Sequence, residues 1–352
     1  KSVTGIKEKE PFTNNPIEEY ASTGGYYFAT GKIAKKYINE LFAKDILING
    51  EAYISSAFDL MIKDGLNVNV FDIDYFFQWG TPEDYEEFLY CMDEIDSLKT
   101  DKQINLSNFN LVIPAAGMGS RFTDKGYTTP KIFLNVNGNK MIKTILNKFK
   151  NQSTTSVLGN KYVIDKLNEV FADSSNVRLS SVDSVTKGQS DSANLLIEEI
   201  ENDLPIFIQS ADCILSDIDL NNIMSLDPDL VVLTKQNYRR AITNPENYGW
   251  VLSENNLVNK TNIKKKPSNK NYSMILGSFI FKNKELYQKI YKELLKQAPG
   301  ELHIDYMIDI ALSMDLKVVE LTSNSASVIG TPLEFELHKY SEFIFNRLQN
   351  EN

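Results

Sequence analysis

The stretch from Leu111 to Lys131, LVIPAAGMGSRFTDKGYTTPK, constrains the fold of this chain more than any other. Its apolar start at 111–113 is typical of a buried strand. Small residues follow at 114–120, where the backbone can approach a ligand closely and successive N–H groups form a concave anion site. Arg121 and Lys131 add two cations suited to phosphate. The pattern predicts a strand followed by a loop that holds a nucleoside triphosphate by its phosphates.

Two other glycine loops that bind phosphate do not fit this stretch. Phe122 stands where the dinucleotide fingerprint G-x-G-x-x-G needs its third glycine, and no acidic residue ends a second strand at the expected distance. The P-loop pattern G-x-x-x-x-G-K-[ST] is absent. The alternative without a ligand is a glycine-rich turn from strand to helix that carries one surface arginine.

The stretch resembles the signature of the nucleotidyltransferases, or pyrophosphorylases, which make nucleotide sugars and related activated metabolites. Their pattern is A-A-G-x-G-[ST]-R, a variable gap and then P-K, and both halves are present at 115–121 and 130–131. The resemblance implies an α/β fold with a Rossmann-like (GT-A-like) mixed sheet flanked by helices. It also implies that Arg121 and Lys131 are catalytic. It assigns nucleotide binding to the loop residues Ala115, Ala116, Gly117, Met118, Gly119 and Ser120.

Two polar positions further along complete the implied nucleotide site. The segment TKGQS at 186–190 matches a family segment beside the base, so the resemblance gives Gln189 a hydrogen bond to the base. Asp212 follows a buried strand at 204–209, and ligands of open α/β sheets gather outside such strand ends. The resemblance implies that Asp212 binds Mg²⁺, the cofactor, although the family usually has Gly or Asn where Ala211 stands. A solvated glutamine and an aspartate capping a turn are the alternatives.

The side that would bind the acceptor departs from the family. The loop ending in Tyr248 and Gly249 fits, but the Glu-Lys pair expected after it is replaced by Lys265 and Lys266. This change removes an acceptor of hydrogen bonds from sugar hydroxyls and adds a cation. It favours a more anionic acceptor, or one that is not a hexose phosphate, with a solvated lysine run as the alternative. Glu301 completes the expected acceptor-binding residues.

The second metal ligand is the least defined part of the implied site. Many sugar-specific members have an Asp just before the late G-T pair, whereas Val328 and Ile329 precede Gly330 here. Cytidylyltransferase relatives instead place an acid on the helix after the acceptor strand. The resemblance then points to Asp305 as the second metal ligand.

An internal repeat organises the rest of the chain. The triplet GTP at 80–82 returns at 330–332, and the pair GE at 50–51 returns at 300–301, in each case 250 positions later. Such a repeat is too long for a solenoid unit. Six further identical pairs share this offset: Ile54/Ile304, Asp59/Asp309, Leu66/Leu316, Val68/Val318, Glu86/Glu336 and Tyr90/Tyr340. The chain therefore contains two copies of one segment.

The repeat predicts how the chain divides into domains. The second copy follows a complete nucleotide-binding half, whereas nothing of that kind precedes the first copy. Residues 1–98 are expected to be the C-terminal half of a nucleotidyltransferase-like unit, followed by a polar linker at 99–108 and the complete domain at 109–352. Strands are expected in the first copy at 24–28 and 68–73. Either a longer polypeptide supplied the missing half, or the remnant is structural.

Composition limits the classes of partner. The 352 residues carry a net charge of −10, with a pI of about 5.0, which argues against nucleic acid or an anionic membrane surface. Cys91 and Cys213 lie too far apart in sequence to indicate a disulfide framework, which favours a reducing cytoplasm. No run suits a membrane span and no signal peptide is evident, while a start at Lys1 is expected of a fragment.

The implied reaction is attack of an acceptor phosphate on the α-phosphorus of an NTP, with release of pyrophosphate. A phosphomonoester has its second pKa at about 6 and is mostly a dianion at pH 7, so the nucleophile needs no general base. The expected partners are an NTP and a phosphorylated small-molecule acceptor, a sugar phosphate or a phospho-alcohol used for surface polysaccharide precursors. Self-association stays open. The alternatives are a catalytically inactive nucleotide- or sugar-sensing homologue and a glycosyltransferase-like or scaffolding protein.

Overall fold

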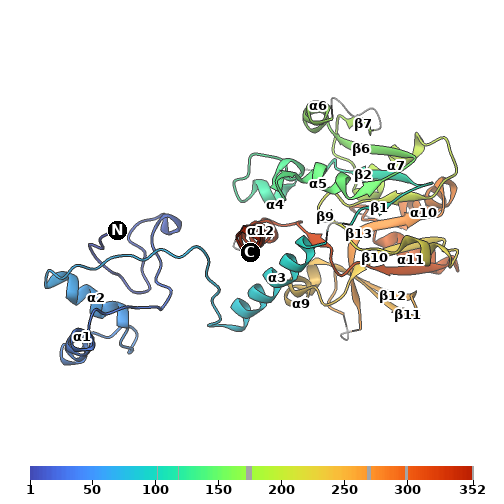
Figure 1. The fold of residues 1–352 in the computed structure, drawn as a ribbon. Helices are drawn as coiled ribbons and strands as arrows, with labels where there is room; N and C mark the ends of the chain where they lie inside the picture. The colour runs from blue at the N-terminus through green and yellow to red at the C-terminus, as the bar shows by residue number, and fades with distance from the viewer. Residues whose placement is uncertain (101, 118, 172–176, 268–270, 298–299, 351–352) are drawn as a thin grey trace. The chain divides into compact units, whose positions relative to one another are not determined.

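The computed structural model describes residues 1–100, 102–117, 119–171, 177–267, 271–297 and 300–350. They form two compact units, Lys1–Asp84 and Tyr85–Asn352. The fold of each unit can be followed in Figure 1 by its labels and colours.

The first unit is built on two amphipathic helices. These are α1 (Gly31–Ala43) and α2 (Ile54–Lys63), preceded by the short 3₁₀ turn η1 (Pro16–Glu18). The side chain of Thr30 caps α1 by accepting a hydrogen bond from the amide of Ile33. The helices contact each other through a small core, which contains Tyr37, Leu41, Ala57, Phe58, Leu60, Met61 and Val68.

The strands expected at 24–28 and 68–73 do not form. Among residues 1–84, the pairings outside helices are two isolated bridges, Ser2 with Asn69 and Ile48 with Glu51. The segment 24–28 is extended or bent but has no neighbouring strand. A strand is stabilised by hydrogen bonds along a neighbour. Residues 68–70 bond to Lys1 and Val3 over this one bridge, which is too short for a ladder, and no neighbour pairs with 24–28 within residues 1–84.

The second unit contains a nine-stranded mixed sheet in the order β10-β14-β12-β11-β13-β8-β2-β6-β7. Strands β8, β2, β6 and β7 are parallel, whereas β13 is antiparallel to both β8 and β10. The predicted mixed α/β sheet is therefore confirmed. The strand bounds are β2 Asn110–Pro114, β6 Thr154–Asn160, β7 Val177–Val182, β8 Ile206–Ile208, β10 Leu230–Lys235, β11 Gly249–Glu254, β12 Leu257–Ile263, β13 Ser273–Phe281 and β14 Val318–Thr322.

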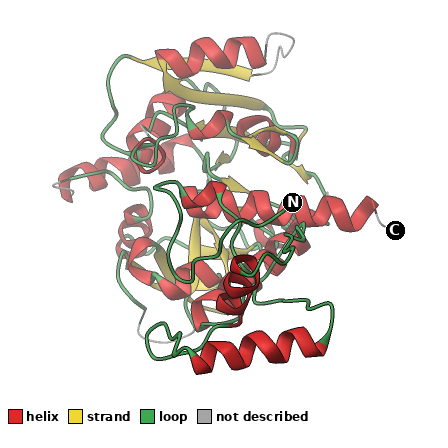
Figure 2. Cartoon of the chain, turned by 90° about the vertical axis from the view of Figure 1, so that its left-hand side faces the viewer, coloured by secondary structure: helices red, strands yellow, loops and turns green. Residues whose placement is uncertain are grey.

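Helices flank this sheet (Figure 2). They are α3 Pro82–Leu98, α4 Ser120–Thr123, α5 Met141–Asn147, α6 Lys161–Val170, α7 Gln189–Glu198, α8 Leu220–Met224, α9 Arg239–Thr243, α10 Lys284–Gln297, α11 Tyr306–Ser313 and α12 Pro332–Asn350, with 3₁₀ turns η2 Lys131–Phe133 and η3 Pro245–Asn247. Helices α7, α10 and α11 share one continuous core with alternate residues of the strands, such as Val112 and Ile208. The intervening residues Leu111 and Ile113 are also fully buried, so β2 is covered on both faces.

Three short two-stranded ladders complete the second unit. They are β1 (Ile104–Asn105) with β5 (Phe149–Lys150), β3 (Asn135–Val136) with β4 (Asn139–Lys140), and β9 (Cys213–Ile214) with β15 (Ser327–Val328). The β1 strand and the fully buried Leu106 lie inside 99–108, which the sequence predicts to be a polar linker. Alternating apolar residues among polar ones let this segment join the second unit.

Helix α3 belongs mostly to the second unit, because the two units divide at Asp84 and Tyr85. Its buried Glu94 lies 2.8 Å from Nδ1 of His338 on α12, and neither side chain is exposed. Nε2 of His338 lies 3.0 Å from Oδ1 of Asn137. The boundary between the two compact units, at Asp84 and Tyr85, therefore lies before the boundary expected after residue 98.

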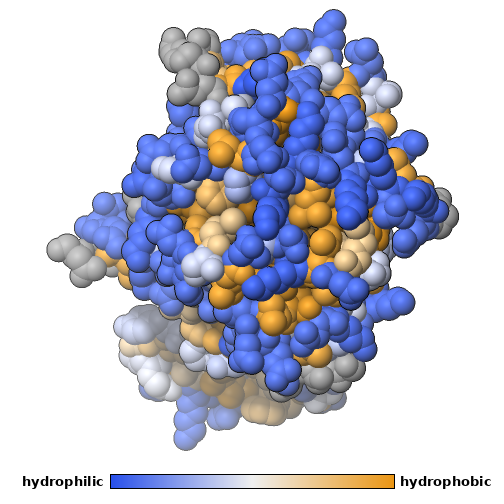
Figure 3. All heavy atoms as spheres, turned by 90° about the vertical axis from the view of Figure 1, so that its right-hand side faces the viewer, coloured by the Kyte–Doolittle hydropathy of each residue, from blue (hydrophilic) through white to orange (hydrophobic). Residues whose placement is uncertain are grey.

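The surface is mainly hydrophilic on the face seen in Figure 3, with hydrophobic residues visible between charged and polar ones. Among the helices that the structure describes, none combines the length and the apolar character that crossing a bilayer requires.

Candidate nucleotidyl-transfer site

The glycine loop begins where β2 leaves the sheet. The amide of Ala115 donates to the carbonyl of Leu158 on β6 at 2.8 Å, and Ala115 and Ala116 are buried. Gly119 has a φ of +64°, a conformation that favours glycine. A Cβ on Gly117 would meet nothing within 4 Å, so the space beside this residue is open. Met118, expected to bind nucleotide, lies outside the described residues.

Phe122 anchors the loop in place of the third glycine of a dinucleotide fingerprint. Its ring is buried and makes edge contacts with Tyr127 and Phe335, at centroid distances of 5.3 and 6.4 Å. The neighbouring Ser120 and Arg121 are exposed. The charge of Arg121 lowers the pKa of Asp212, so the structure brings these two predicted site residues near each other.

Lys131 and Asp212 form an ion pair. Nζ of Lys131 lies 2.6 Å from Oδ2 of Asp212, and the hydroxyl of Ser210 donates to Oδ1 at 2.5 Å. Burial raises the pKa of Asp212, but Lys131, Ser210 and Arg121 together outweigh burial and leave this pKa below its usual value. Asp212 follows β8 at the carboxyl end of the parallel strands, where β2 also leads into the glycine loop. The carboxylate is therefore ionised at neutral pH and faces two cations.

A second carboxylate, which the sequence reasoning missed, lies close to Asp212. A Cβ on Gly330 would lie 3.3 Å from Oδ2 of Asp212 and 3.5 Å from Oε2 of Glu334, so this glycine leaves space between the two acids. Oε2 of Glu334 accepts from the amide of Gly330 and the hydroxyl of Thr331, both at 3.0 Å. The sequence T-x-x-E at 331–334 matches the capping-box pattern at the start of a helix, and this pattern could have drawn attention to Glu334.

The other carboxylate oxygen of Glu334, Oε1, accepts hydrogen bonds from two tyrosines. Tyr238 and Tyr248 donate their hydroxyls to Oε1 at 2.9 and 2.8 Å. Burial first, and then the charge of Glu334, raises the pKa of Tyr248 well above its usual range, which keeps it a donor. Four donors thus hold one buried carboxylate. They come from parts of the chain nearly a hundred residues apart.

Gln189 is held beside the sheet by a close backbone contact. Gly188 has a φ of +145°, and a Cβ there would lie 2.6 Å from the carbonyl oxygen of Leu302. The amide and hydroxyl of Ser190 both donate to that carbonyl. Nε2 of Gln189 donates to the carbonyl of Gly277 at 3.0 Å, so one side of this amide is already used by the fold. Its contact with a base stays a prediction.

The exposed Lys264, at the end of β12, lies in a cluster with His303 and Glu301. The amide of Lys264 donates to the carbonyl of Tyr248 at 3.0 Å, and its Nζ lies 2.8 Å from Nε2 of His303. Oε2 of Glu301 lies 3.2 Å from the same nitrogen. Lys265 and Lys266 are exposed, and the described contacts do not bring them to this cluster. The roles of Lys265 and Lys266 in binding an acceptor stay predictions.

Asp305 lies against Gly249, the first residue of β11. A Cβ on Gly249 would lie 2.6 Å from Oδ2 of Asp305, so only glycine fits beside this carboxylate. Burial raises the pKa of Asp305 from 3.8 to about 6, and the charge of Lys264 acts in the opposite direction. Its assignment as a second metal ligand stays a prediction.

Comparison with known proteins agrees with this arrangement. The sequence model described as nucleotidyl transferase matches residues 111–335, which include the glycine loop, Asp212 and the capping box of α12. The chain belongs to the nucleotidyl transferase family. It is an enzyme of the nucleotidyltransferase class, EC 2.7.7. No curated protein matches it in sequence.

Solved structures share the fold of this nucleotidyltransferase. A nucleoside-diphosphate-sugar pyrophosphorylase from Vibrio cholerae is 20% identical, with a TM-score of 0.54, over 65% of this chain and 99% of that one. A putative glucose-1-phosphate thymidylyltransferase from Bacillus anthracis is 17% identical, with a TM-score of 0.53, over 68% and 96%. An inositol-1-phosphate CTP transferase from T. maritima is 17% identical, with a TM-score of 0.50, over 67% and 96%.

The protein supplies only some of the ligands that a magnesium ion needs, and the phosphates of a bound substrate would supply the others. No group of three or more acidic, histidine or cysteine side chains that could hold a metal occurs within the described ranges. Mg²⁺ is commonly bound by one or two carboxylates together with substrate phosphates, and Asp212 supplies one such carboxylate beside an open loop. The nucleotidyltransferase would therefore bind the ion together with the NTP.

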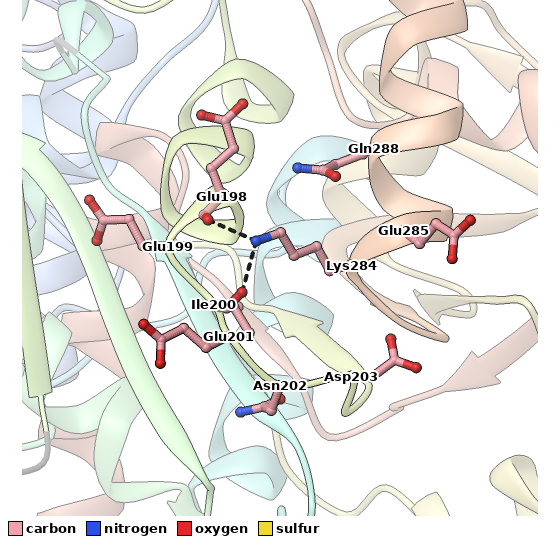
Figure 4. A pocket seen from close by; sticks show the side chains of 9 residues that line it. All are labelled: Glu198, Glu199, Ile200, Glu201, Asn202, Asp203, Lys284, Glu285 and Gln288. Atoms are coloured by element: carbon pink, nitrogen blue, oxygen red, sulfur yellow. Dashed lines mark hydrogen bonds between the residues drawn. The ribbon is translucent and has the colours of Figure 1, made fainter.

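A hollow of about 600 Å³ lies away from this site (Figure 4). Its lining comes from the end of α7, the segment before β8 and the start of α10, so it opens at the amino edge of β8, opposite Asp212. Lys284 donates there to the carbonyls of Glu198 and Ile200, each at 2.8 Å. Acidic side chains dominate the lining, which disfavours a phosphorylated ligand.

Proposed function

We propose that this nucleotidyltransferase transfers a nucleotidyl group from an NTP to the phosphate of a sugar phosphate or phospho-alcohol, in a reaction that depends on Mg²⁺ and releases pyrophosphate. The observation that carries the proposal is the Lys131–Asp212 ion pair near the glycine loop. When an NTP binds, this ion pair opens. Phosphate oxygens then take the place of Asp212 beside Lys131, and a metal cation takes the place of Lys131 beside Asp212.

The chain's own residues account for the remaining requirements of this chemistry. In this proposal, the loop amides and Arg121 bind the phosphates that leave as pyrophosphate, and Lys131 neutralises charge on the reacting phosphate. A magnesium ion supplies Lewis-acid stabilisation of the α-phosphate when it is bound. Gln189 is the candidate for contact with the base. No general base is needed, since the acceptor phosphate is already a dianion.

The acceptor side of the site supports an anionic substrate. Nζ of Lys264 contacts His303, and its charge acts on Asp305. Gly249 begins the neighbouring strand β11, and Tyr248 directly precedes it. The named activities of the similar structures, on sugar and inositol phosphates, suit such a site. We propose that the product serves as a cytoplasmic precursor for surface polysaccharide.

The test is pyrophosphate release measured with each NTP against a panel of sugar phosphates and phospho-alcohols, with and without Mg²⁺. At least one pair is expected to give turnover that requires both the metal and the acceptor. Asp217→Asn is the matched control for Asp212→Asn, because Asp217 is an exposed partner of Lys102. Nucleotide binding without release for any pair would instead support a non-catalytic sensor.

A further inference from the structure

The carboxylate of Glu334 is fully occupied by hydrogen bonds within the protein. An ionised carboxylate has about four lone-pair sites, two on each oxygen. Oε1 accepts from the hydroxyls of Tyr238 and Tyr248, and Oε2 accepts from the amide of Gly330 and the hydroxyl of Thr331. While these four bonds persist, no lone pair of this carboxylate is left for a metal ion. The role of Glu334 is therefore to hold other groups in place.

The two tyrosines that bind Oε1 differ in exposure. Tyr238 is 2% exposed, and its ring packs edge to face against that of Tyr248, with the centroids 5.9 Å apart. Tyr248 is partly exposed and directly precedes β11. Burial and the charge of Glu334 raise the pKa of Tyr248, whereas the charges of Arg240 and Arg121 act in the opposite direction. Tyr248 is therefore the tyrosine that can meet a ligand, and its hydroxyl lies within electrostatic range of the glycine loop.

The bond to Glu334 decides which kind of hydrogen bond the Tyr248 hydroxyl can still make. A phenol carries one proton, and Tyr248 donates this proton to Oε1 of Glu334 at 2.8 Å. Its oxygen can then only accept a hydrogen bond from a third group. The partly exposed face of Tyr248 thus offers an uncharged acceptor, and a ligand that meets it has to supply a donor.

Gly330 relates this acceptor to the carboxylate of Asp212. A Cβ on Gly330 would lie 3.3 Å from Oδ2 of Asp212 and 3.5 Å from Oε2 of Glu334. The Tyr248 hydroxyl is therefore one hydrogen bond beyond Glu334, on the acceptor side of the residue that would bind the metal ion.

We propose that Glu334 is a positioning residue that fixes the Tyr248 hydroxyl as a hydrogen-bond acceptor, so that the site selects an acceptor substrate with a free hydroxyl group near its phosphate. The selection rests on the proposed nucleotidyl transfer and narrows its substrate class. Phosphorylated polyols, such as sugar and inositol phosphates, satisfy the Tyr248 oxygen. Phosphate esters without a free hydroxyl leave this oxygen without a donor in a site closed to water.

Pyrophosphate release tests this selection with glucose 1-phosphate, inositol 1-phosphate and analogues in which one hydroxyl is replaced by hydrogen or by fluorine. Neither replacement can donate a hydrogen bond. At one position of the substrate, both replacements are expected to lower kcat/KM of the wild type by about tenfold or more. Tyr248→Phe should abolish this preference for the hydroxyl and leave the KM of the NTP unchanged. Tyr238→Phe is the matched control, because it removes a bond to the same Oε1 but should retain the preference.

Glu334→Gln tests the direction of the Tyr248 proton. An amide has one oxygen and two N–H groups, so it satisfies only one pair of the four donors. With its oxygen on Gly330 and Thr331, its N–H groups face the tyrosines, and Tyr248 becomes a donor toward the site. The preference for hydroxyl over fluorine should then fall by about fivefold or more, with the same Mg²⁺ requirement as the wild type. A raised Mg²⁺ requirement would make Glu334 a metal ligand and overturn the proposal.

A spectroscopic measurement separates this proposal from the proposed function. If no pair of NTP and acceptor gives turnover, the proposed function fails, and ¹³C NMR of protein labelled at tyrosine Cζ still reports the direction of the proton. The Tyr248 signal, assigned with Tyr248→Phe, should move to higher field in Glu334→Gln, because a phenol that stops donating loses phenolate character. An unchanged signal overturns the proposal. So does a wild type without any hydroxyl preference, or an equal loss of preference in Tyr238→Phe and Tyr248→Phe.

Discussion

Arg121 and Asp212 are held very differently, and the difference decides what their substitution can show. Arg121 is exposed, and among the described residues it forms no ion pair or hydrogen bond. Asp212 is bound by Lys131 and Ser210, so its loss leaves a partly buried lysine without a counter-ion. A change at Arg121 should therefore affect activity alone, whereas a change at Asp212 should affect activity, metal use and stability.

Arg121→Ala is expected to lower kcat by about 100- to 1000-fold, the cost typical of removing one group that stabilises transition-state charge. The melting temperature should stay within about 1 °C of wild type, because the side chain is exposed and substitutions at such surface positions change stability little. Steady-state pyrophosphate release and thermal melting measure the two effects. Arg178→Ala, which removes an exposed arginine paired with Glu199, is the control. Near-normal kcat in Arg121→Ala would contradict the assignment of the loop.

Asp212→Asn is expected to raise the Mg²⁺ concentration needed for half-maximal rate by about tenfold or more, since an amide lacks the charge of a carboxylate. In the wild type, the ionised Asp212 stabilises the folded protein, and this contribution is lost as the pH falls through its lowered pKa. The variant should lack this contribution at every pH. Metal titration of the rate and chemical unfolding at several pH values provide the measurements. An unchanged metal requirement would reduce Asp212 to a structural partner of Lys131.

At the scale of elements, two glycines allow close approaches near the starts of α7 and α11. Gly188 precedes α7 and lies against the backbone of Leu302, and Gly249 begins β11 against Asp305, which precedes α11. Side chains at either glycine would force the elements apart. These contacts join the predicted base-binding loop to the acceptor side of the site.

Gly188→Ala should destabilise the protein on the order of 2 kcal/mol, because it adds a clash at 2.6 Å to a backbone conformation that only glycine adopts readily. The nucleotide KM should rise as the segment carrying Gln189 shifts, and chemical unfolding with NTP titration would show both effects. Gly300→Ala is the control, since a Cβ there meets nothing within 4 Å. Equal stability of the two variants would exclude the close approach.

The buried Asp305, just before α11, should make the free energy of unfolding depend on pH. Its pKa is raised from 3.8 to about 6, so between about pH 4 and 6 the folded protein keeps a proton that the unfolded chain has lost. The free energy of unfolding therefore falls as the pH rises through this window, on the order of 2 kcal/mol for this group. Asp305→Asn should remove this dependence in urea unfolding from pH 4.5 to 7. The exposed Asp315→Asn should retain it, and parallel profiles would refute the assignment.

At the scale of the whole molecule, α3 shows that the repeat and the compact units are not the same division. The sequence places α3 in the first copy, yet its buried Tyr90, Glu94 and Ile95 belong to the second unit. The hydroxyl of Tyr90 lies 3.5 Å from the carbonyl of Val328, next to the Gly330 turn of the site. The catalytic domain therefore includes a helix that precedes its glycine loop.

A shortened chain that begins at residue 82 is expected to keep the nucleotide site and the melting temperature of the second unit. A chain that begins at 109 lacks α3 and leaves buried Nδ1 of His338 without its partner Glu94, a loss of about 1–3 kcal/mol in addition to lost apolar contacts. NTP binding and thermal melting compare the two chains. Loss of binding in the chain from 82 would mean that residues 1–81 complete the site.

The sequence by itself determined the features that depend on neighbouring residues. The strand 110–114, the glycine loop and the cations Arg121 and Lys131 follow from local hydrophobic pattern and backbone freedom, and so do helices such as α1 and α10. The family signature is local too, which is why the nucleotidyltransferase class and the mixed sheet could be predicted.

Only the tertiary structure decided the features that need partners far along the chain. Glu334 lies beside Asp212 because Tyr238, Tyr248 and Gly330 converge on it. Lys264 is held near His303 because its amide bonds to the carbonyl of Tyr248. Segments 24–28 and 277–281 have similar sequences, yet only the second is a strand, because only it has β8 and β10 beside it. Strand formation requires a neighbour, and no local pattern supplies one.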